Sequence, residues 1–189
     1  TLFAVYSEWL HLIVRWVHII VGVAWIGTSF YFNWLDSRLE RDDPDFKHLD
    51  GYLWSVHSGG FYRIEKLKGP PKKLPKVLHW FKWEAYATWI SGFVLLILVY
   101  YLNASSMMLG ASGIILTPFQ AILISIFLLI GSWLLYDYLC KNVLKNNEQT
   151  LIATGVLLFV LLSYFLTEIY GSRAAYIHVG AIIGTIMAA

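Results

Sequence analysis

The chain has 189 residues, of which 58% are hydrophobic and only 14% are charged. Soluble domains are about 45–50% apolar and about 25% charged, so this composition excludes an ordinary soluble domain and indicates an integral membrane protein. The single cysteine, Cys140, excludes an internal disulfide and any CxxCH haem-attachment motif within the chain, and the net charge of +2 excludes no class of partner by itself.

Five apolar segments follow one another along the chain, each long enough or nearly long enough to cross a bilayer. Only helices and closed barrels satisfy the backbone in lipid, and these segments lack the strict alternation of barrel strands. The sequence therefore predicts an all-α integral membrane protein, with a bundle of about five transmembrane helices in one membrane domain over residues 1–189. The expected helices cover residues 9–35, 80–102, 119–139, 151–170 and 174–189.

The connections between these helices differ in length and polarity. Residues 36–78 form a long polar loop, and its stretch KGPPKKLP cannot be helical because proline lacks the backbone N–H. Residues 103–117 carry no charge, which predicts a loop close to the membrane surface. The last segment would span about 22 Å at about 1.5 Å per residue, which is less than a ~30 Å hydrocarbon core. We therefore expect this chain to be the N-terminal part of a larger bundle.

Lysine and arginine gather on one side of the predicted bundle. The loop 36–78 holds most of them, Lys141 and Lys145 follow the third helix on the same side, and the opposite side has only Arg173. Cytoplasmic loops are enriched in these residues. The loop 36–78 is therefore predicted to be cytoplasmic, with the N-terminus outside.

The first helix carries ionisable residues at membrane depth. His11, Arg15 and His18 are spaced i, i+4 and i+7, so they lie on one stripe. Arginine in lipid costs at least a few kcal/mol, so such a stripe indicates a functional site. The structural alternative is an interfacial His11, a His18 bonded to a neighbouring helix, and an Arg15 paired with a carboxylate. The stripe continues through Gly22, Trp25 and Ser29.

A further histidine lies at the same depth in the last segment. His178 is about one turn into that helix, which places it level with His11 and His18. Two imidazoles from facing helices are typical of a bis-histidine haem. A zinc or copper site would also use imidazole, but few cysteines or carboxylates are available to complete it.

Two motifs on the predicted cytoplasmic side hold further candidates. His57 precedes Ser58, Gly59 and Gly60, so an imidazole lies beside a flexible backbone that a ligand can approach closely. His79 comes shortly before Glu84 at the start of the second helix. The structural alternatives are a solvent-exposed turn for the first motif and an interfacial anchor for His79.

Four stretches carry a family resemblance: RWVHIIVGVAWIGTSFYFNWLD, LWSVHSGGFYRIEK, LHWFKWEAYATWISGF and AAYIHVGAIIGTIMAA. Together they resemble the membrane domain of the bacterial membrane-bound urate oxidases, which are fused to a C-terminal c-type cytochrome domain. The resemblance implies a multi-pass protein of the bacterial inner (cytoplasmic) membrane that acts in purine catabolism. It implies oxidation of urate to 5-hydroxyisourate, with electrons passed through haem to cytochrome c.

The resemblance also implies roles for the residues singled out above. His18 matches the family's first-helix histidine and is predicted to bind the iron of a haem b, with His178 as the facing iron ligand and His11 as a reserve. Arg15 would pair with a haem propionate or with Glu168. The predicted catalytic residues are His57, His79 and Glu84, and the predicted substrate-binding residues are Gly59 and Gly60.

The expected partners follow from the same resemblance. They are urate, the lipid bilayer, a terminal oxidase, and either the cytochrome c domain or a soluble cytochrome c; haem c would lie on the C-terminal domain, which this chain lacks. No nucleic-acid partner is expected.

Two alternative functions remain open. The chain could be a b-type haem subunit that only relays electrons within a respiratory assembly, or a haem- or metal-handling membrane protein that uses the histidine stripe as an ion path.

Overall fold

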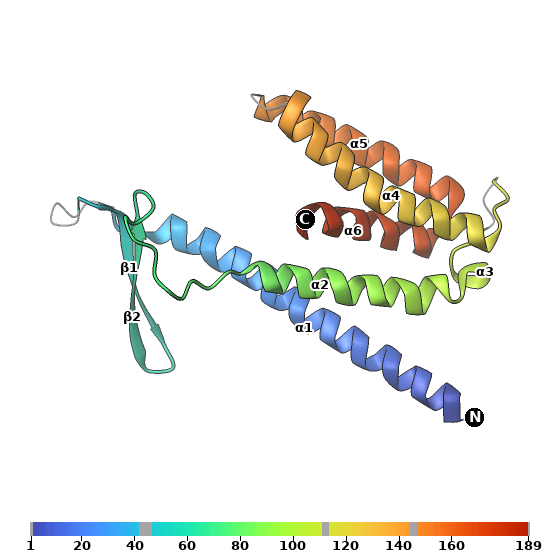
Figure 1. Ribbon diagram of the computed structural model, residues 1–189, viewed down its shortest axis with the longest axis horizontal. Helices are drawn as coiled ribbons and strands as arrows, with labels where there is room; N and C mark the ends of the chain where they lie inside the picture. Colours follow the sequence, from blue (N-terminus) through green and yellow to red (C-terminus); the bar gives the residue numbers. More distant parts are fainter. Residues whose placement is uncertain (1, 42–46, 111–113, 144–146, 189) are drawn as a thin grey trace.

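The computed structural model describes residues 2–41, 47–110, 114–143 and 147–188. It confirms the predicted all-α membrane bundle and adds a small β-hairpin at one end (Figure 1). The elements in chain order are α1 (Leu2–Arg38), β1 (Leu49–His57), β2 (Gly60–Leu67), α2 (Lys82–Leu95) with the π-helical turn η2 (Leu96–Tyr101), α3 (Ala104–Met107), α4 (Pro118–Tyr138) with the π-helical turn η3 (Leu139–Val143), α5 (Glu148–Ile169) and α6 (Ser172–Ala188).

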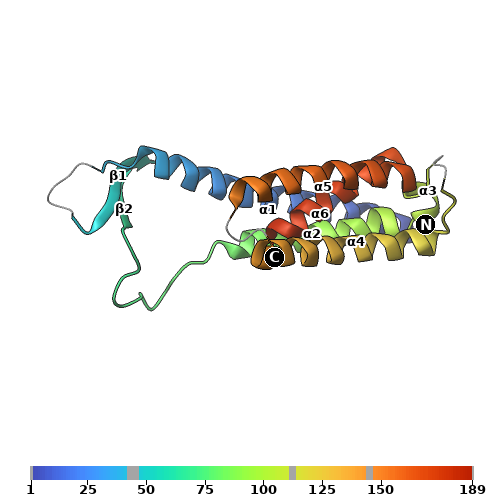
Figure 2. The ribbon, with the colours of Figure 1, turned by 90° about the horizontal axis from the view of Figure 1, so that it is seen from above.

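Within the described residues, four helices are long and apolar enough to cross a membrane, namely α1, α2 with its π-helical turn, α4 and α5. The predicted fifth helix is present as α6, whose 17 residues make it shorter than these four. Figure 2 shows α2, α4, α5 and α6 running side by side along the bundle, with α1 extending past them towards the hairpin. The 37 residues of α1 span about 55 Å at about 1.5 Å per residue, so α1 projects beyond a ~30 Å hydrocarbon core.

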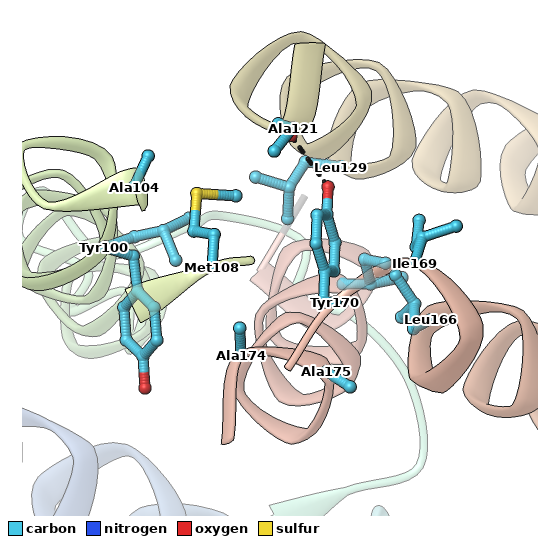
Figure 3. Close-up of a cluster of buried hydrophobic side chains, with 12 residues drawn as sticks. Tyr100, Ala104, Met108, Ala121, Leu129, Leu166, Ile169, Tyr170, Ala174 and Ala175 are labelled. Atoms are coloured by element: carbon cyan, nitrogen blue, oxygen red, sulfur yellow. Dashed lines mark hydrogen bonds between the residues drawn. The ribbon is translucent and has the colours of Figure 1, made fainter. Parts of the chain in front are cut away.

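The best-packed part of the bundle joins α4, α5 and α6 to the far end of α2. Figure 3 shows Tyr170, in the turn between α5 and α6, pointing towards α4. Its hydroxyl donates a hydrogen bond to the backbone oxygen of Ala121 at 2.8 Å, so a buried polar group is satisfied across two elements. Met108 fills the space beside Ala104 and Leu129 and is fully buried.

A buried histidine fastens three helices of this cluster. His178 of α6 has no exposed surface, and its Nδ1 donates to the backbone oxygen of Ala174 at 2.7 Å, because a carbonyl oxygen can only accept. Nε2 of the neutral ring then accepts from the hydroxyl of Ser125 on α4 at 2.7 Å. The Ser125 oxygen in turn accepts from the hydroxyl of Tyr101 in η2 at 2.6 Å. Both imidazole nitrogens are thus used within the protein.

The region predicted as a loop at residues 36–78 contains the antiparallel hairpin β1–β2, and this is a correction to the sequence prediction. Tyr52, Trp54 and Val56 are residue types that favour strands. The turn needs positive φ at both central residues, and Ser58 (φ 49°) and Gly59 (φ 79°) supply it. The prediction missed the hairpin because its strands are embedded in a polar stretch. No helix forms over the Pro-rich residues 68–75, as predicted.

The hairpin is tied to the end of α1. Glu40 and Tyr52 exchange backbone hydrogen bonds of 2.8 and 3.1 Å, and Lys66 forms an ion pair with Asp36 at 2.9 Å. The hydrogen bond with Asp36 raises the pKa of Lys66. Gly51 is required at the base of the hairpin, because a Cβ there would lie 2.8 Å from the Cβ of Leu39.

The segment 103–117, predicted as a loop, contains the one-turn helix α3, and residues 111–113 lie outside the described residues. Its described part is fixed to the α5–α6 turn, because the backbone N–H of Gly171 donates to the Met108 oxygen at 2.8 Å. This contact places the segment at the α5–α6 end of the bundle, away from the hairpin (Figure 1).

The buried chain through His178 makes a prediction about stability. Ser125→Ala leaves Nε2 of His178 without its partner in an apolar interior, which should lower the free energy of unfolding by about 1–3 kcal/mol. Thermal unfolding in detergent measures this change. The matched control is Ser163→Ala, since Ser163 donates only to the Phe159 carbonyl of its own helix at 2.8 Å, and it should change stability by no more than about 0.5 kcal/mol. Equal effects of the two substitutions would contradict the assignment.

Candidate functional site

The site is built around the contact between α1 and α2, where His18 meets a polar stripe on the neighbouring helix. Its Nδ1 lies 3.1 Å from the backbone oxygen of Thr88 and 3.0 Å from the hydroxyl of Ser91. The Ser91 hydroxyl donates to the Ala87 oxygen at 2.7 Å, so its own hydrogen is already used. Nδ1 therefore carries the proton and donates to α2. Among the described residues nothing bonds to Nε2, so its lone pair is left for another partner.

Small residues on both helices allow this close contact. A Cβ at Gly92 would lie 3.0 Å from Cε1 of His18, so a larger residue at position 92 would push on the imidazole. A Cβ at Gly22 would lie 3.7 Å from the Thr88 methyl group, which is ordinary contact. The position of the imidazole is therefore set by α2 as well as by α1.

A cavity of about 730 Å³ lies beside His18, between α1, α2 and α6. We call it the larger cavity. This volume falls within the range of small-molecule and cofactor sites, about 300–1,000 Å³. The π-helical turn η2 borders it through Leu96, Val99 and Tyr100, and π-helical turns in helices are frequent at functional sites. Its other lining residues include Arg15, His18 and Trp25 of α1, Trp89, Gly92 and Phe93 of α2, and Arg173, Tyr176, Gly180, Gly184 and Thr185 of α6.

Two arginines from different helices border this cavity. Arg15 comes from α1 and Arg173 from the first turn of α6, and both side chains are exposed. Neither forms an ion pair within the part of the chain that the structure describes, so the predicted pairing of Arg15 with Glu168 is not formed. Guanidinium groups bind carboxylates in a bidentate manner. The cavity therefore offers two free cationic groups to an anionic ligand.

A second cavity of about 360 Å³ lies towards the hairpin end of α1. We call it the smaller cavity, and it is lined by Trp25, Thr28, Ser29, Phe32, Asn33 and Phe81. Trp25 borders both cavities. The histidine stripe of α1 thus continues into a series of polar and aromatic residues that face a cavity of their own.

Of the three histidines predicted to bind haem iron, His18 alone borders the larger cavity. His11 lines a separate cavity of about 270 Å³ with Glu8 and Arg15. His178 could bind a metal only after its hydrogen bond to Ser125 or to Ala174 is broken. The structure therefore brings one of the three imidazoles to the cavity with a free nitrogen.

The predicted catalytic residues fall into two groups. His79 and Glu84 lie together at the start of α2, with 3.8 Å between Nε2 and Oε1, and the His79 ring contacts Phe81 edge to face. The second carboxylate oxygen of Glu84 is buried and has no hydrogen-bond partner among the described residues. His57 instead lies at the tip of the hairpin together with Gly59 and Gly60, and the hairpin stands apart from α2 in both views (Figures 1 and 2).

Several residues of the site were missed by sequence reasoning. Thr88 and Ser91 continue the stripe of Glu84 at i+4 and i+7, and this spacing could have identified them. Arg173 could not be placed from the sequence, because nothing local indicates that the start of α6 borders the same cavity as α1. The same holds for Ser125, which meets His178 only through the packing of α4 on α6.

The comparison with family profiles identifies the family. The profile described as urate oxidase N-terminal matches residues 4–189, which is nearly the whole chain. The chain belongs to the urate oxidase N-terminal family. The comparison with curated proteins gave no match, and the comparison with solved structures gave none either. Membership confirms the family that the four sequence motifs resemble, and it supports a urate-related function for this urate oxidase N-terminal domain.

The family resemblance implies a haem, and the donors around the larger cavity fit one. No group of three His, Cys, Asp or Glu side chains converges within the described residues, as a protein-held zinc or copper ion would need. The macrocycle of a haem supplies four nitrogen ligands to the iron. The protein therefore needs to supply only one imidazole nitrogen, such as Nε2 of His18, on one face of the haem. A metal-binding histidine usually donates its other ring N–H to a carbonyl or carboxylate, as His18 does to Thr88.

The glycines of α6 make the fit testable. Gly180 lines the larger cavity, a Cβ there would meet no atom within 4 Å, and helix propensity favours leucine over glycine, so a leucine at this position is expected to occupy part of the cavity. We expect Gly180→Leu in this domain to remain folded and to lose most of its haem, as measured by pyridine haemochrome absorbance. Gly155→Leu on α5, which also meets nothing within 4 Å but does not border the cavity, is the control. Full haem content in Gly180→Leu would exclude the larger cavity as the site.

Proposed function

We propose that this domain is the membrane part of a urate oxidase that converts urate to 5-hydroxyisourate and passes the electrons to a cytochrome c. Urate and water together give 5-hydroxyisourate, two electrons and two protons. One observation carries the proposal: in a chain of the urate oxidase N-terminal family, His18 borders a cavity that is also lined by two arginines, and within the described residues its Nε2 makes no hydrogen bond and the arginines form no ion pair. This arrangement supports a redox cofactor held within the membrane.

The proposed cofactor is haem b. His18 would bind the iron through Nε2, and Arg15 and Arg173 would bind the propionates, which offsets the cost of placing arginines near lipid. A bound haem would supply a one-electron acceptor. The residues of the chain position it: the hydrogen bond to Thr88 fixes the imidazole, and the glycines of α6 leave room for a flat macrocycle.

Proton removal from the substrate is assigned to His79 with Glu84. The oxidation releases two protons, so a group of suitable pKa must accept them near the reacting ring. The His79 side chain is largely exposed, which lets it exchange protons with water, and its Nε2 lies 3.8 Å from a carboxylate oxygen of Glu84. The hairpin end of the bundle is proposed to face the cytoplasm of a bacterial cell, as the distribution of lysine and arginine favours.

One observation favours a second candidate function, a b-type haem subunit that relays electrons without its own substrate. The candidate catalytic residues are not gathered in one place, because the hairpin that carries His57 stands apart from His79 and Glu84 (Figure 1). Reduction of the haem by urate separates the two functions. In a urate oxidase, urate alone reduces the haem of the purified protein; in a relay subunit it does not.

The first prediction from this proposal concerns the iron ligand. His18→Ala removes Nε2 and should abolish the Soret band of the purified protein, while the protein stays in the membrane. Ser91→Ala is the matched control, since it removes one hydrogen-bond partner of Nδ1 but keeps both the imidazole and the Thr88 carbonyl. It should retain the haem. A normal Soret band in His18→Ala would show that the iron is bound elsewhere.

The second prediction concerns the electron acceptor. Membranes with the full-length protein should consume urate and oxygen only while a terminal oxidase works, because urate oxidation and oxygen reduction then occur at separate sites. Cyanide should stop urate loss, an artificial electron acceptor should restore it, and hydrogen peroxide should not appear in proportion to urate consumed. Urate loss that continues under cyanide with matching peroxide would instead indicate a direct oxygen-using oxidase.

A further inference from the structure

We infer that the smaller cavity is the substrate site and that it binds the flat, N–H-rich oxopurine ring of urate. The inference rests on the proposed function and adds to it the place, the recognising groups and the side of entry. It places the substrate between α1 and the start of α2, and leaves the turn of the hairpin without a role in substrate binding.

Aromatic side chains form one wall of this cavity. Phe32 and Phe81 meet edge to face, with 5.2 Å between ring centroids and an interplanar angle of 75°, and Trp25 also lines the cavity. The two phenyl rings therefore present surfaces in different orientations, which suits a planar ring that stacks on one face while its edge meets the other. Heterocyclic bases bind to such surfaces because each of them has a π-face.

Three polar side chains of α1, those of Thr28, Ser29 and Asn33, form the rest of the lining, which we call the polar wall, and their hydrogen bonds decide what they recognise. The Thr28 hydroxyl donates to the Ala24 carbonyl at 2.7 Å, and the Ser29 hydroxyl donates to the Trp25 carbonyl at 3.2 Å. Because their hydrogens are used within α1, both oxygens offer only lone pairs to a ligand. They therefore select a ligand that donates hydrogen bonds through N–H groups.

Asn33 completes this wall with a side-chain amide that both donates and accepts. An amide of this kind matches a ring edge on which an N–H group lies next to a carbonyl, as Asn and Gln match base edges. Urate has such edges in both of its rings. A hydrocarbon would leave Thr28, Ser29 and Asn33 without partners, and a simple carboxylate, which only accepts, would leave the Thr28 and Ser29 oxygens without a donor. The polar wall therefore favours an oxopurine over either.

The place of the cavity connects it to the proposed proton and electron acceptors. His79 contacts Phe81 at 4.6 Å between ring centroids, so the base proposed for the reaction borders the aromatic wall. Trp25 borders both cavities, and therefore one side chain can contact both a ring bound here and a cofactor in the larger cavity. Water would add its oxygen at the oxidised carbon, two protons would leave, and two electrons would pass one at a time to the haem. The substrate enters from the hairpin end.

The first experiment measures KM for urate in variants of α1. It compares hydroxyl groups that line the smaller cavity with one that does not, although each donates a hydrogen bond to a carbonyl of the same helix. Ser29→Ala and Thr28→Val remove acceptors from the cavity, and Asn33→Leu removes the amide. Ser37→Ala is the control, because the Ser37 hydroxyl also donates to a carbonyl of α1, that of Trp34, at 2.7 Å, but lies outside the cavity. In the full-length protein, we expect each cavity substitution to raise KM for urate about tenfold with haem content unchanged, since a ligand N–H loses its partner.

A second experiment tests binding of urate to the smaller cavity without relying on catalytic turnover. It measures how far urate protects an introduced cysteine from alkylation. Ser29→Cys and Ser37→Cys are made in a Cys140→Ser background, and alkylation of each thiol is timed with and without urate. Urate should slow alkylation at position 29 and leave it unchanged at position 37. A urate methylated on a ring nitrogen should protect less well, because a methyl group replaces a donor.

The outcomes separate this inference from the proposed function. Unchanged KM values in all three cavity variants, or equal alkylation of position 29 with and without urate, would overturn the substrate site while urate-dependent haem reduction in the wild type still supported the function. If urate neither reduces the haem nor is consumed by the wild type, the proposed function fails and this inference fails with it.

Discussion

The hydrogen bond that His18 gives to the backbone of α2 is the interaction on which the arrangement of the site depends. In lipid no water is available to satisfy a ring nitrogen, so the imidazole must find its partner on a neighbouring helix. That partner, the Thr88 carbonyl at 3.1 Å, fixes where α1 lies on α2. It also fixes the tautomer, and with it the nitrogen that remains free. Both cavities have α1 as one wall, so their shapes follow from the same contact.

His18 and His178, two of the three histidines predicted at membrane depth, show that local partners, and not depth, decide what an imidazole can do. His178 has a carbonyl on one nitrogen and the Ser125 hydroxyl on the other, so it holds α6 against α4. His18 has both of its hydrogen-bond acceptors, Thr88 and Ser91, on Nδ1, and its side chain borders the larger cavity. One histidine is therefore a structural link, and the other retains a lone pair for chemistry.

The sequence predicted the all-α bundle and the inward stripe of α1, because hydrophobic length and helical spacing are local properties. It did not predict which helices meet. The pairing of His178 with Ser125, the approach of Arg173 to Arg15 across one cavity, and the separation of His57 from His79 all arise from contacts between distant segments. Serine and threonine gave little signal, since in an apolar helix they usually bond to their own backbone. The hairpin was missed because strand propensity is a weak guide within a polar loop.

The continuity of α1 places the two cavities at a set distance from each other. His18 and Trp25 are seven residues apart on one unbroken helix, so they lie on the same face and are separated by about 10 Å along its axis. A spacing set by a helix does not change when loops move, unlike one set by the hairpin or by the connection to α2. Trp25, which borders both cavities, is therefore held between the proposed substrate and cofactor positions by the sequence spacing itself. The length of this helix therefore both allows it to cross a membrane and sets the spacing between the two cavities that α1 lines.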